Sequence, residues 1–179
     1  MAFWSNASSE AKRNYRFKVF LGDGADSIVW WAKGVTLPSF DVTETEHDYL
    51  DNKYYFPGRV TWSEVELTMV DPISTDAVDK TNQILVSSGY KIASTQASQK
   101  PFITKAASDT AVKNFEIQIL NGEGTVIEKW ILKNVFIKAA KFGDLAYDND
   151  DLREITMTLR YDWAECTIGS GGTPTFAPS

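Results

Sequence analysis

Apolar and polar residues alternate with a period of two along most of the chain. The clearest case is the stretch 60–70, where Val65, Leu67 and Met69 alternate with charged and hydroxyl side chains. Successive side chains of a strand point to opposite faces, so this pattern predicts antiparallel strands with one buried face. Strands are predicted over residues 15–21, 28–35, 60–70, 115–120, 125–132, 135–142 and 152–163.

Residues 40–56 break this pattern because they are polar on both faces. The stretch reads "FDVTETEHDYL", then "DNK", then "YYFPG", which predicts a long hairpin. Such a hairpin is hard to place in the core of a single subunit, and we expect it to reach a neighbouring copy. Its aromatic residues have few rotatable bonds and are the candidate contacts between stacked copies: Tyr49, Tyr54, Tyr55 and Phe56.

One helix is predicted after Asp71-Pro72. Ala77, Val78, Thr81, Ile84 and Leu85 form a stripe at helical spacing, and a glycine at position 89 can end the helix. Residues 91–112 are small, polar and weakly patterned, so we expect a long loop there.

The chain repeats itself at an offset of 100 positions. Residues 21–35 read "LGDGADSIVWWAKGV" and residues 121–135 read "NGEGTVIEKWILKNV". The glycines of a Gly-acid-Gly turn coincide in the two copies, and Trp30 coincides with Trp130. Each copy is therefore predicted to be a strand–turn–strand hairpin, the first joining 15–21 to 28–35 and the second joining 115–120 to 125–132. Downstream, "VELTMV" at 65–70 resembles "ITMTLR" at 155–160, at an offset of 90. The turn glycines are Gly22, Gly24, Gly122 and Gly124.

The repeat predicts a mainly β fold, a two-layer antiparallel sandwich or partly open barrel with internal pseudo-duplication and one central helix. The second copy would supply the layer against which the first copy buries its apolar face. We expect an N-terminal arm at 1–14, a single domain at 15–166 and a flexible C-terminal tail at 167–179. The domain would comprise one half at about 15–73, a bridging helix and loop at 74–112, and a second half at about 113–166.

Charge and composition limit the classes of function. The 179 residues carry a formal net charge of −6, which argues against a surface that grips nucleic acid. The single cysteine, Cys166, excludes an internal disulfide and a multi-cysteine metal site. The single histidine, His47, leaves no pair for acid–base or triad catalysis. We therefore expect no enzyme activity, no cofactor, no metal and no membrane segment.

A duplicated open sheet leaves strand edges that can pair with another chain. If such edges pair head to tail between identical subunits and the rotation closes, the product is a ring. The sequence therefore predicts self-association into rings.

Two longer strings are similar to the tail tube proteins of contractile-tailed bacteriophages, with the T-even phages as the nearest likeness. They are "YYFPGRVTWSEVELTMVDP" and "KFGDLAYDNDDLREITMTLRYDWAE", and "TLPSF" after a tryptophan-bearing strand adds to them. The resemblance covers about residues 10–168. It implies hexameric rings that stack into the inner tail tube, a conduit through which phage DNA passes to the host during contraction.

The resemblance also implies partners and a location. The partners are the tail sheath, baseplate and tail-terminator proteins, with the tape-measure protein and viral DNA passing through the lumen. The chain would be assembled in the host cytoplasm and reside in the virion tail. Carboxylates on the wall would repel DNA phosphates over a screening distance of about 8 Å. The candidates for the lumen lie on polar strand faces, although a solvated exterior is the other position open to them: Glu44, Glu46, Asp48, Glu64, Glu66 and Glu154.

Three alternatives stay open. A tube-initiating baseplate protein would have the same subunit fold, and so would the tube of a secretion or injection apparatus. A carbohydrate-binding β-sandwich belongs to a different class, since the six tryptophans and seven tyrosines could stack on sugar rings.

Overall fold

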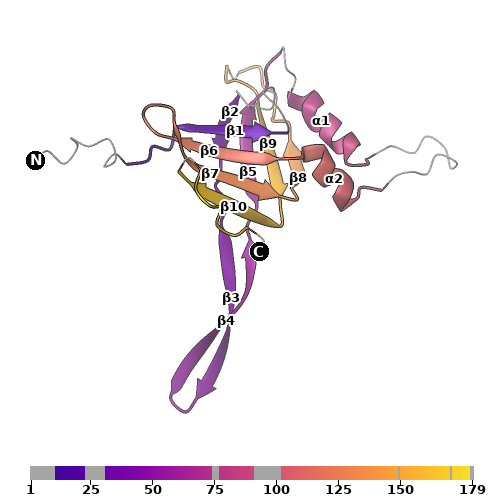
Figure 1. The fold of residues 1–179 in the computed structure, drawn as a ribbon. Helices are drawn as coiled ribbons and strands as arrows, with labels where there is room; N and C mark the ends of the chain where they lie inside the picture. The colour runs from indigo at the N-terminus through magenta and orange to yellow at the C-terminus, as the bar shows by residue number, and fades with distance from the viewer. Residues whose placement is uncertain are drawn as a thin grey trace, which may run out of the picture.

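The computed structural model describes residues 11–22, 31–73, 77–90, 102–148, 150–169 and 171–177. These residues form two four-stranded antiparallel sheets and a two-stranded hairpin. Figure 1 shows that the strands of one sheet cross those of the other, that the helices lie together at one side, and that the hairpin projects away from the body. The predicted mainly β, two-layer antiparallel fold is confirmed.

Sheet I has the strand order β1-β6-β7-β10 and sheet II the order β2-β5-β9-β8. The strands of sheet I are β1 (Phe17–Leu21), β6 (Phe115–Leu120), β7 (Val126–Lys133) and β10 (Trp163–Ile168). Those of sheet II are β2 (Ala32–Val35), β5 (Val65–Val70), β9 (Glu154–Arg160) and β8 (Phe136–Lys141). The hairpin consists of β3 (Phe40–Tyr49) and β4 (Asn52–Trp62).

The core lies between the two sheets. Phe115, Ile117 and Leu132 of sheet I are fully buried against side chains of sheet II. The period-two alternation predicted this face correctly, because β5 and β9 bury every second residue. The fully buried residues of sheet II are Val65, Leu67, Ile155, Met157 and Leu159.

Two strand predictions need correction. The stretch 60–70 is not one strand, because β4 ends at Trp62 and β5 begins at Val65. The break lets the chain pass from the projecting hairpin into sheet II, and the Ser63 N–H donates to the Ser39 carbonyl across the hairpin base, 2.8 Å away. The strand β10 was not predicted, because three of its consecutive residues are buried and no alternation marks it.

The predicted helix is confirmed as α1 (Ala77–Ser87), and a second helix, α2 (Lys105–Val112), replaces part of the loop expected at 91–112. Thr104 caps α2 by accepting a hydrogen bond from the Ala107 N–H at 3.2 Å. The helix was missed because its alanines and hydroxyl residues give a weak apolar stripe. Residues 91–101 lie outside the described part of the chain.

The repeat does not form two equivalent hairpins. The second copy is a true hairpin, β6–β7, whereas β1 belongs to sheet I and β2 to sheet II. Each sheet therefore contains strands of both halves, and neither copy makes a layer by itself. Trp30 and the rest of 23–30 lie outside the described residues.

The strand register nevertheless shows the pseudo-two-fold relation directly. Lys18 pairs with Gln118, which is its own equivalent at an offset of 100. Leu67 pairs with Met157, its own equivalent at an offset of 90. An antiparallel pair in which a residue faces its own equivalent has a local two-fold axis at that point. The strands related by the offset of 100 thus pair around a two-fold axis in sheet I, and those related by the offset of 90 pair around one in sheet II.

The edges of sheet II follow the same symmetry. Lys33 is an extra residue in a bulge of β2, and Lys138 is the extra residue in the matching bulge of β8. Lys33 forms an ion pair with Glu154, and Lys138 forms one with Glu64, which is the equivalent of Glu154 at the offset of 90. Each pair joins one half of the chain to the other.

Replacing Leu67 with alanine should destabilise the fold strongly, because this side chain is fully buried at the axis of sheet II. The expected loss in the free energy of unfolding is about 2–5 kcal/mol, measured by urea denaturation. Leu145→Ala is the matched control, since Leu145 is 84% exposed. A similar loss for both variants would contradict the assignment of the core.

The attachment of α2 should depend on pH. Burial raises the pKa of Asp162, but hydrogen bonds from Lys105 and from Asn134, at 2.7 Å, outweigh it and lower the pKa. A lowered pKa stabilises the fold above the ordinary carboxyl value of about 4, and this contribution is lost as the pH falls through the folded value. Asp162→Asn should therefore flatten stability against pH below about 5, measured by urea denaturation at several pH values. An unchanged pH profile would exclude this role for Asp162.

Candidate assembly surfaces

The β3–β4 hairpin is the most prominent surface feature. Every residue of β3 is exposed, as is every residue of β4 up to Thr61. The ten residues of β3 span about 30 Å of extended strand. Figure 1 shows the hairpin extending well beyond the two sheets, with its tip far from the rest of the chain. A polar ribbon of this length buries little within its own subunit.

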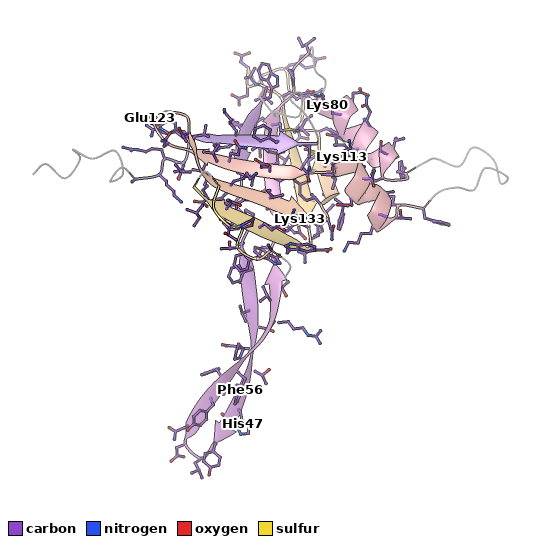
Figure 2. The ribbon with its side chains drawn as sticks, in the orientation of Figure 1. His47, Phe56, Lys80, Lys113, Glu123 and Lys133 are labelled. Atoms are coloured by element: carbon purple, nitrogen blue, oxygen red, sulfur yellow. The ribbon has the colours of Figure 1, made fainter. Side chains whose placement is uncertain are left out.

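The register divides the hairpin into two faces, because directly opposed residues lie on the same side of a sheet. Tyr49, His47 and their partners Asn52 and Tyr54 occupy one face, together with the opposed pair of Thr45 and Phe56. The His47 and Phe56 rings lie 6.4 Å apart there, and both are labelled in Figure 2. The other face carries the acids and Tyr55: Glu44, Glu46 and Asp48 with Pro57, Tyr55 and Lys53. Three of the four candidate aromatic contacts thus share one face.

A bulge at Thr43 interrupts the regular pairing of the hairpin. The Thr43 hydroxyl accepts a hydrogen bond from the Arg59 N–H at 2.9 Å. Gly58 is required beside it, because a Cβ at this position would lie 2.4 Å from the Thr43 Oγ1 atom. The bulge changes the twist of the ribbon between the base and the tip.

An aromatic cluster fixes the base of the hairpin. Phe40 and Trp62 lie 5.4 Å apart, and Phe176 of the C-terminal segment packs edge-on against both rings. Tyr161 completes the cluster at 6.0 Å from Trp62, and burial raises the pKa of its phenol to about 12. Pairing of Thr175 with Cys166 holds the C-terminal segment in place. These contacts thus hold the base of the hairpin firmly against the rest of the subunit.

The six acidic candidates for the lumen fall into two groups. Glu44, Glu46 and Asp48 lie on the hairpin. Glu66 and Glu154 lie on the outer face of sheet II, as the alternation of β5 and β9 requires, and Glu64 just before β5 is tied to this face by its ion pairs. The structure therefore does not bring all six together.

The outer face of sheet II is not acidic as a whole. Lys33 neutralises Glu154, and both Lys138 and Arg160 lie against Glu64. Lys141, opposite Thr156, adds a further positive charge. The acids on this face are thus matched by bases that come from other strands, which the sequence pattern of a single strand could not reveal.

The excess negative charge lies at the two ends of sheet II. At one end is the hairpin, where Asp41, Glu44, Glu46, Asp48 and Asp51 face only Lys53 and Arg59. At the other end is the connection between β8 and β9, residues 142–153, with Asp144, Asp148, Asp150 and Asp151 against Arg153. These two segments take equivalent places in the two halves, since each connects an edge strand of sheet II to a central strand.

A cleft of about 550 Å³ opens between the sheets where β1 begins. Its floor is apolar, with Phe17, Val35, Leu37, Ile117 and Ile119. Its rim is basic, with Lys12, Arg13, Arg16 and Lys33 against the single acid Glu128. We call it the basic-rimmed cleft.

Glu128 lies within the basic-rimmed cleft as the partner of Lys12. Burial opposes its charge, but hydrogen bonds from Lys12 and from the Trp130 indole, the latter at 2.6 Å, outweigh it and lower the pKa of Glu128. Its carboxylate is therefore ionised at neutral pH and holds the start of the described chain against sheet I. No sequence pattern had indicated this cleft, because its residues come from four separate stretches.

The glycine turns behave differently from one another. Gly124 has φ +82 in the β6–β7 turn, where the Asn121 side chain accepts hydrogen bonds from Glu123 and Thr125. Gly22 has φ +96 but follows β1 without forming a hairpin with β2. Gly122 lies in the same β6–β7 turn, and Gly24 lies outside the described residues.

The chemistry expected from single residues is limited. Burial raises the pKa of the Cys166 thiol, which disfavours a reactive thiolate. Within the described residues, no three histidine, cysteine or acidic side chains gather as metal ligands. No helix among the described residues has the length and apolar character needed to span a bilayer. Trp62 and Trp130 pack against the core, and Trp31 is 49% exposed.

No protein-family model matches the sequence, and no match to a curated protein was found. Solved structures, in contrast, are similar over nearly the whole chain. One chain in the structure of the anti-feeding prophage cap, which is described as tube-terminating, matches with a TM-score of 0.65 and 19% identity. The match covers 94% of this chain and 100% of the other chain.

Two structures from the extracellular contractile injection system PVC are also similar. A chain of the sheath–tube complex matches with a TM-score of 0.60 and 20% identity, over 91% of this chain and 95% of the other. A chain of the sheath/tube terminator matches with a TM-score of 0.61 and 19% identity, over 88% of this chain and 97% of the other. At these identities the similarity concerns the fold. The chain thus has the fold found in tube components of contractile injection systems.

Proposed function

We propose that this chain is a structural subunit of the inner tube of a contractile apparatus, forming hexameric rings that stack. The similarity of fold over nearly the whole chain carries this proposal. Sheath, baseplate and terminator proteins are then the expected partners, since the similar structures come from sheath–tube, terminator and baseplate assemblies. The role requires no catalytic chemistry.

The open edges of the sheets support ring formation. Among the described residues, no strand pairs with the outer edges of β1, β2 or β8. Exposed edges of this kind favour pairing with another chain. Pairing of β2 with β8 of the next copy would extend sheet II around a ring, because these two strands are its edges.

The hairpin supports stacking of the rings. It projects along the strand direction of sheet II, and its aromatic face has no partner strand or helix among the described residues. Tyr49, Tyr54, Tyr55 and Phe56 are each at least 50% exposed. We assign the contact between rings to these residues.

Two candidate functions differ in what the tube carries. A phage tail tube, as the sequence resemblance implies, would carry DNA past an acidic wall. An injection-apparatus tube would carry effectors, and the balanced charge of the outer face of sheet II favours this second candidate if that face lines the lumen. A balanced, hydroxyl-rich surface has no strong attraction for phosphate or for either sign of protein charge.

Purified protein should assemble into rings and tubes visible by negative-stain electron microscopy. Self-assembled tubes indicate the main polymer, and isolated rings indicate a baseplate initiator. A monomer that binds glycan arrays would contradict the proposal and favour the carbohydrate-binding class. Immunolabelling of native particles separates the two cargo candidates, since DNA-filled heads identify a phage and headless tails an injection apparatus.

Deleting the outer part of the hairpin, residues 47–54, and joining the remaining strands by a two-residue turn should leave folded rings that do not stack. The base of the hairpin keeps its aromatic cluster, so the far-ultraviolet circular dichroism and the unfolding midpoint should change little. Sedimentation should show rings in place of tubes. Tube formation at the wild-type concentration would exclude the hairpin from the contact.

A further inference from the structure

We propose that the tip of the β3–β4 hairpin of one copy docks in the basic-rimmed cleft of another copy. This inference rests on the proposed self-assembly and names the surface that receives the hairpin. The tip consists of Tyr49, Leu50 and Asp51, at the end of the acidic ribbon. The cleft offers the complementary features, an apolar floor and a basic rim.

Leu50 is the unusual residue of the tip. It has a positive φ of 53° in the two-residue turn between β3 and β4 and is 85% exposed. A bulky residue with a positive φ is strained, and glycine or asparagine is the usual occupant of such a position. An exposed leucine here costs stability and is scarcely buried by the described residues of its own chain. An apolar contact with another molecule would account for it.

Charge selects the receiving surface. The loop 142–153 lies at the end of sheet II opposite the hairpin, which is the simplest place for a stacked copy to be met. It also exposes Leu145 and Tyr147, but it carries four aspartates against one arginine. The hairpin is acidic as well, so this contact would bring like charges together, which is unfavourable. The cleft has four basic side chains, of which Lys12 is paired with Glu128 and Lys33 with Glu154. Its net charge stays positive even with both acids counted, so it attracts the hairpin instead.

Size agrees with this assignment. The cleft of about 550 Å³ can receive one or two side chains from the tip but not a helix. Leu50 and Tyr49 would lie against Val35 and Ile119, the partly exposed side chains of the floor, leaving the aspartates at the rim. The projecting length of about 30 Å lets the tip pass beyond its own subunit.

Photocrosslinking tests the contact directly. One copy carries p-benzoylphenylalanine in place of Tyr49, and a second, isotope-labelled copy supplies the acceptor. After irradiation of the full-length mixture, mass spectrometry should locate the adduct at the cleft of the labelled copy, within 12–17, 33–37 or 117–119 or at Glu128. An adduct within 1–10, within 142–153 or elsewhere would overturn the proposal, as would the lack of any intermolecular adduct.

Leu50→Gly separates docking from folding. Glycine relieves the positive φ, so the variant should be at least as stable as the wild type in urea denaturation. The critical concentration for tube assembly should nevertheless rise about ten-fold or more, since an apolar anchor is lost. Leu145→Ala is the matched control at a similarly exposed leucine and should assemble normally. The reverse result would favour the acidic loop as the receiving surface.

A charge exchange tests the rim. Arg13→Glu should raise the critical concentration about ten-fold, and Asp51→Lys in the same chain should recover most of the loss. The absence of recovery would argue against contact between the tip and the rim. Electron microscopy of the unsubstituted protein distinguishes the two proposals. If this protein forms tubes but the crosslink lies elsewhere, only the docking is overturned, whereas the absence of rings overturns the proposed function.

Discussion

The pairing of equivalent strands across two local two-fold axes is the interaction on which the rest of the structure depends. At one axis Lys18 faces Gln118, and at the other Leu67 faces Met157. The second pair is fully buried, so the centre of sheet II is also the centre of the core. Because equivalent strands pair with one another, each sheet must contain both halves. The ion pairs from the bulges then tie the edge strands to the opposite half.

The same symmetry places the two outgrowths. The hairpin and the connection 142–153 occupy equivalent positions, so the two-fold relation directs them to opposite ends of sheet II. In the first half this connection is a long ribbon, and in the second half it is a shorter acidic loop. A subunit with two different ends and open lateral edges has the polarity that head-to-tail stacking of rings requires.

The sequence predicted the strands with a buried alternate face, since side-chain direction is local information. Residues 65–70 and 154–160 illustrate this. It missed β10, where Ala164, Glu165 and Cys166 are consecutively buried, and α2, whose small side chains give little periodicity. It also placed 15–21 and 28–35 in one hairpin, because the choice of partner strand depends on distant residues. The charge balance of sheet II was hidden for the same reason, as Lys33 and Glu154 are 121 positions apart.

The distribution of charge bears on how such a subunit assembles. The net charge of −6 suggests a uniformly acidic body, yet the sheet faces are balanced and the excess lies at the two ends. Two ends of the same sign repel when rings meet directly end to end. Attraction must then come from a surface that lies between the ends and carries the opposite sign. Among the described residues the basic-rimmed cleft has this character, and a ribbon of about 30 Å carries the tip of the hairpin beyond its own subunit. The length of the hairpin and the charge of the cleft are thus explained by the same contact.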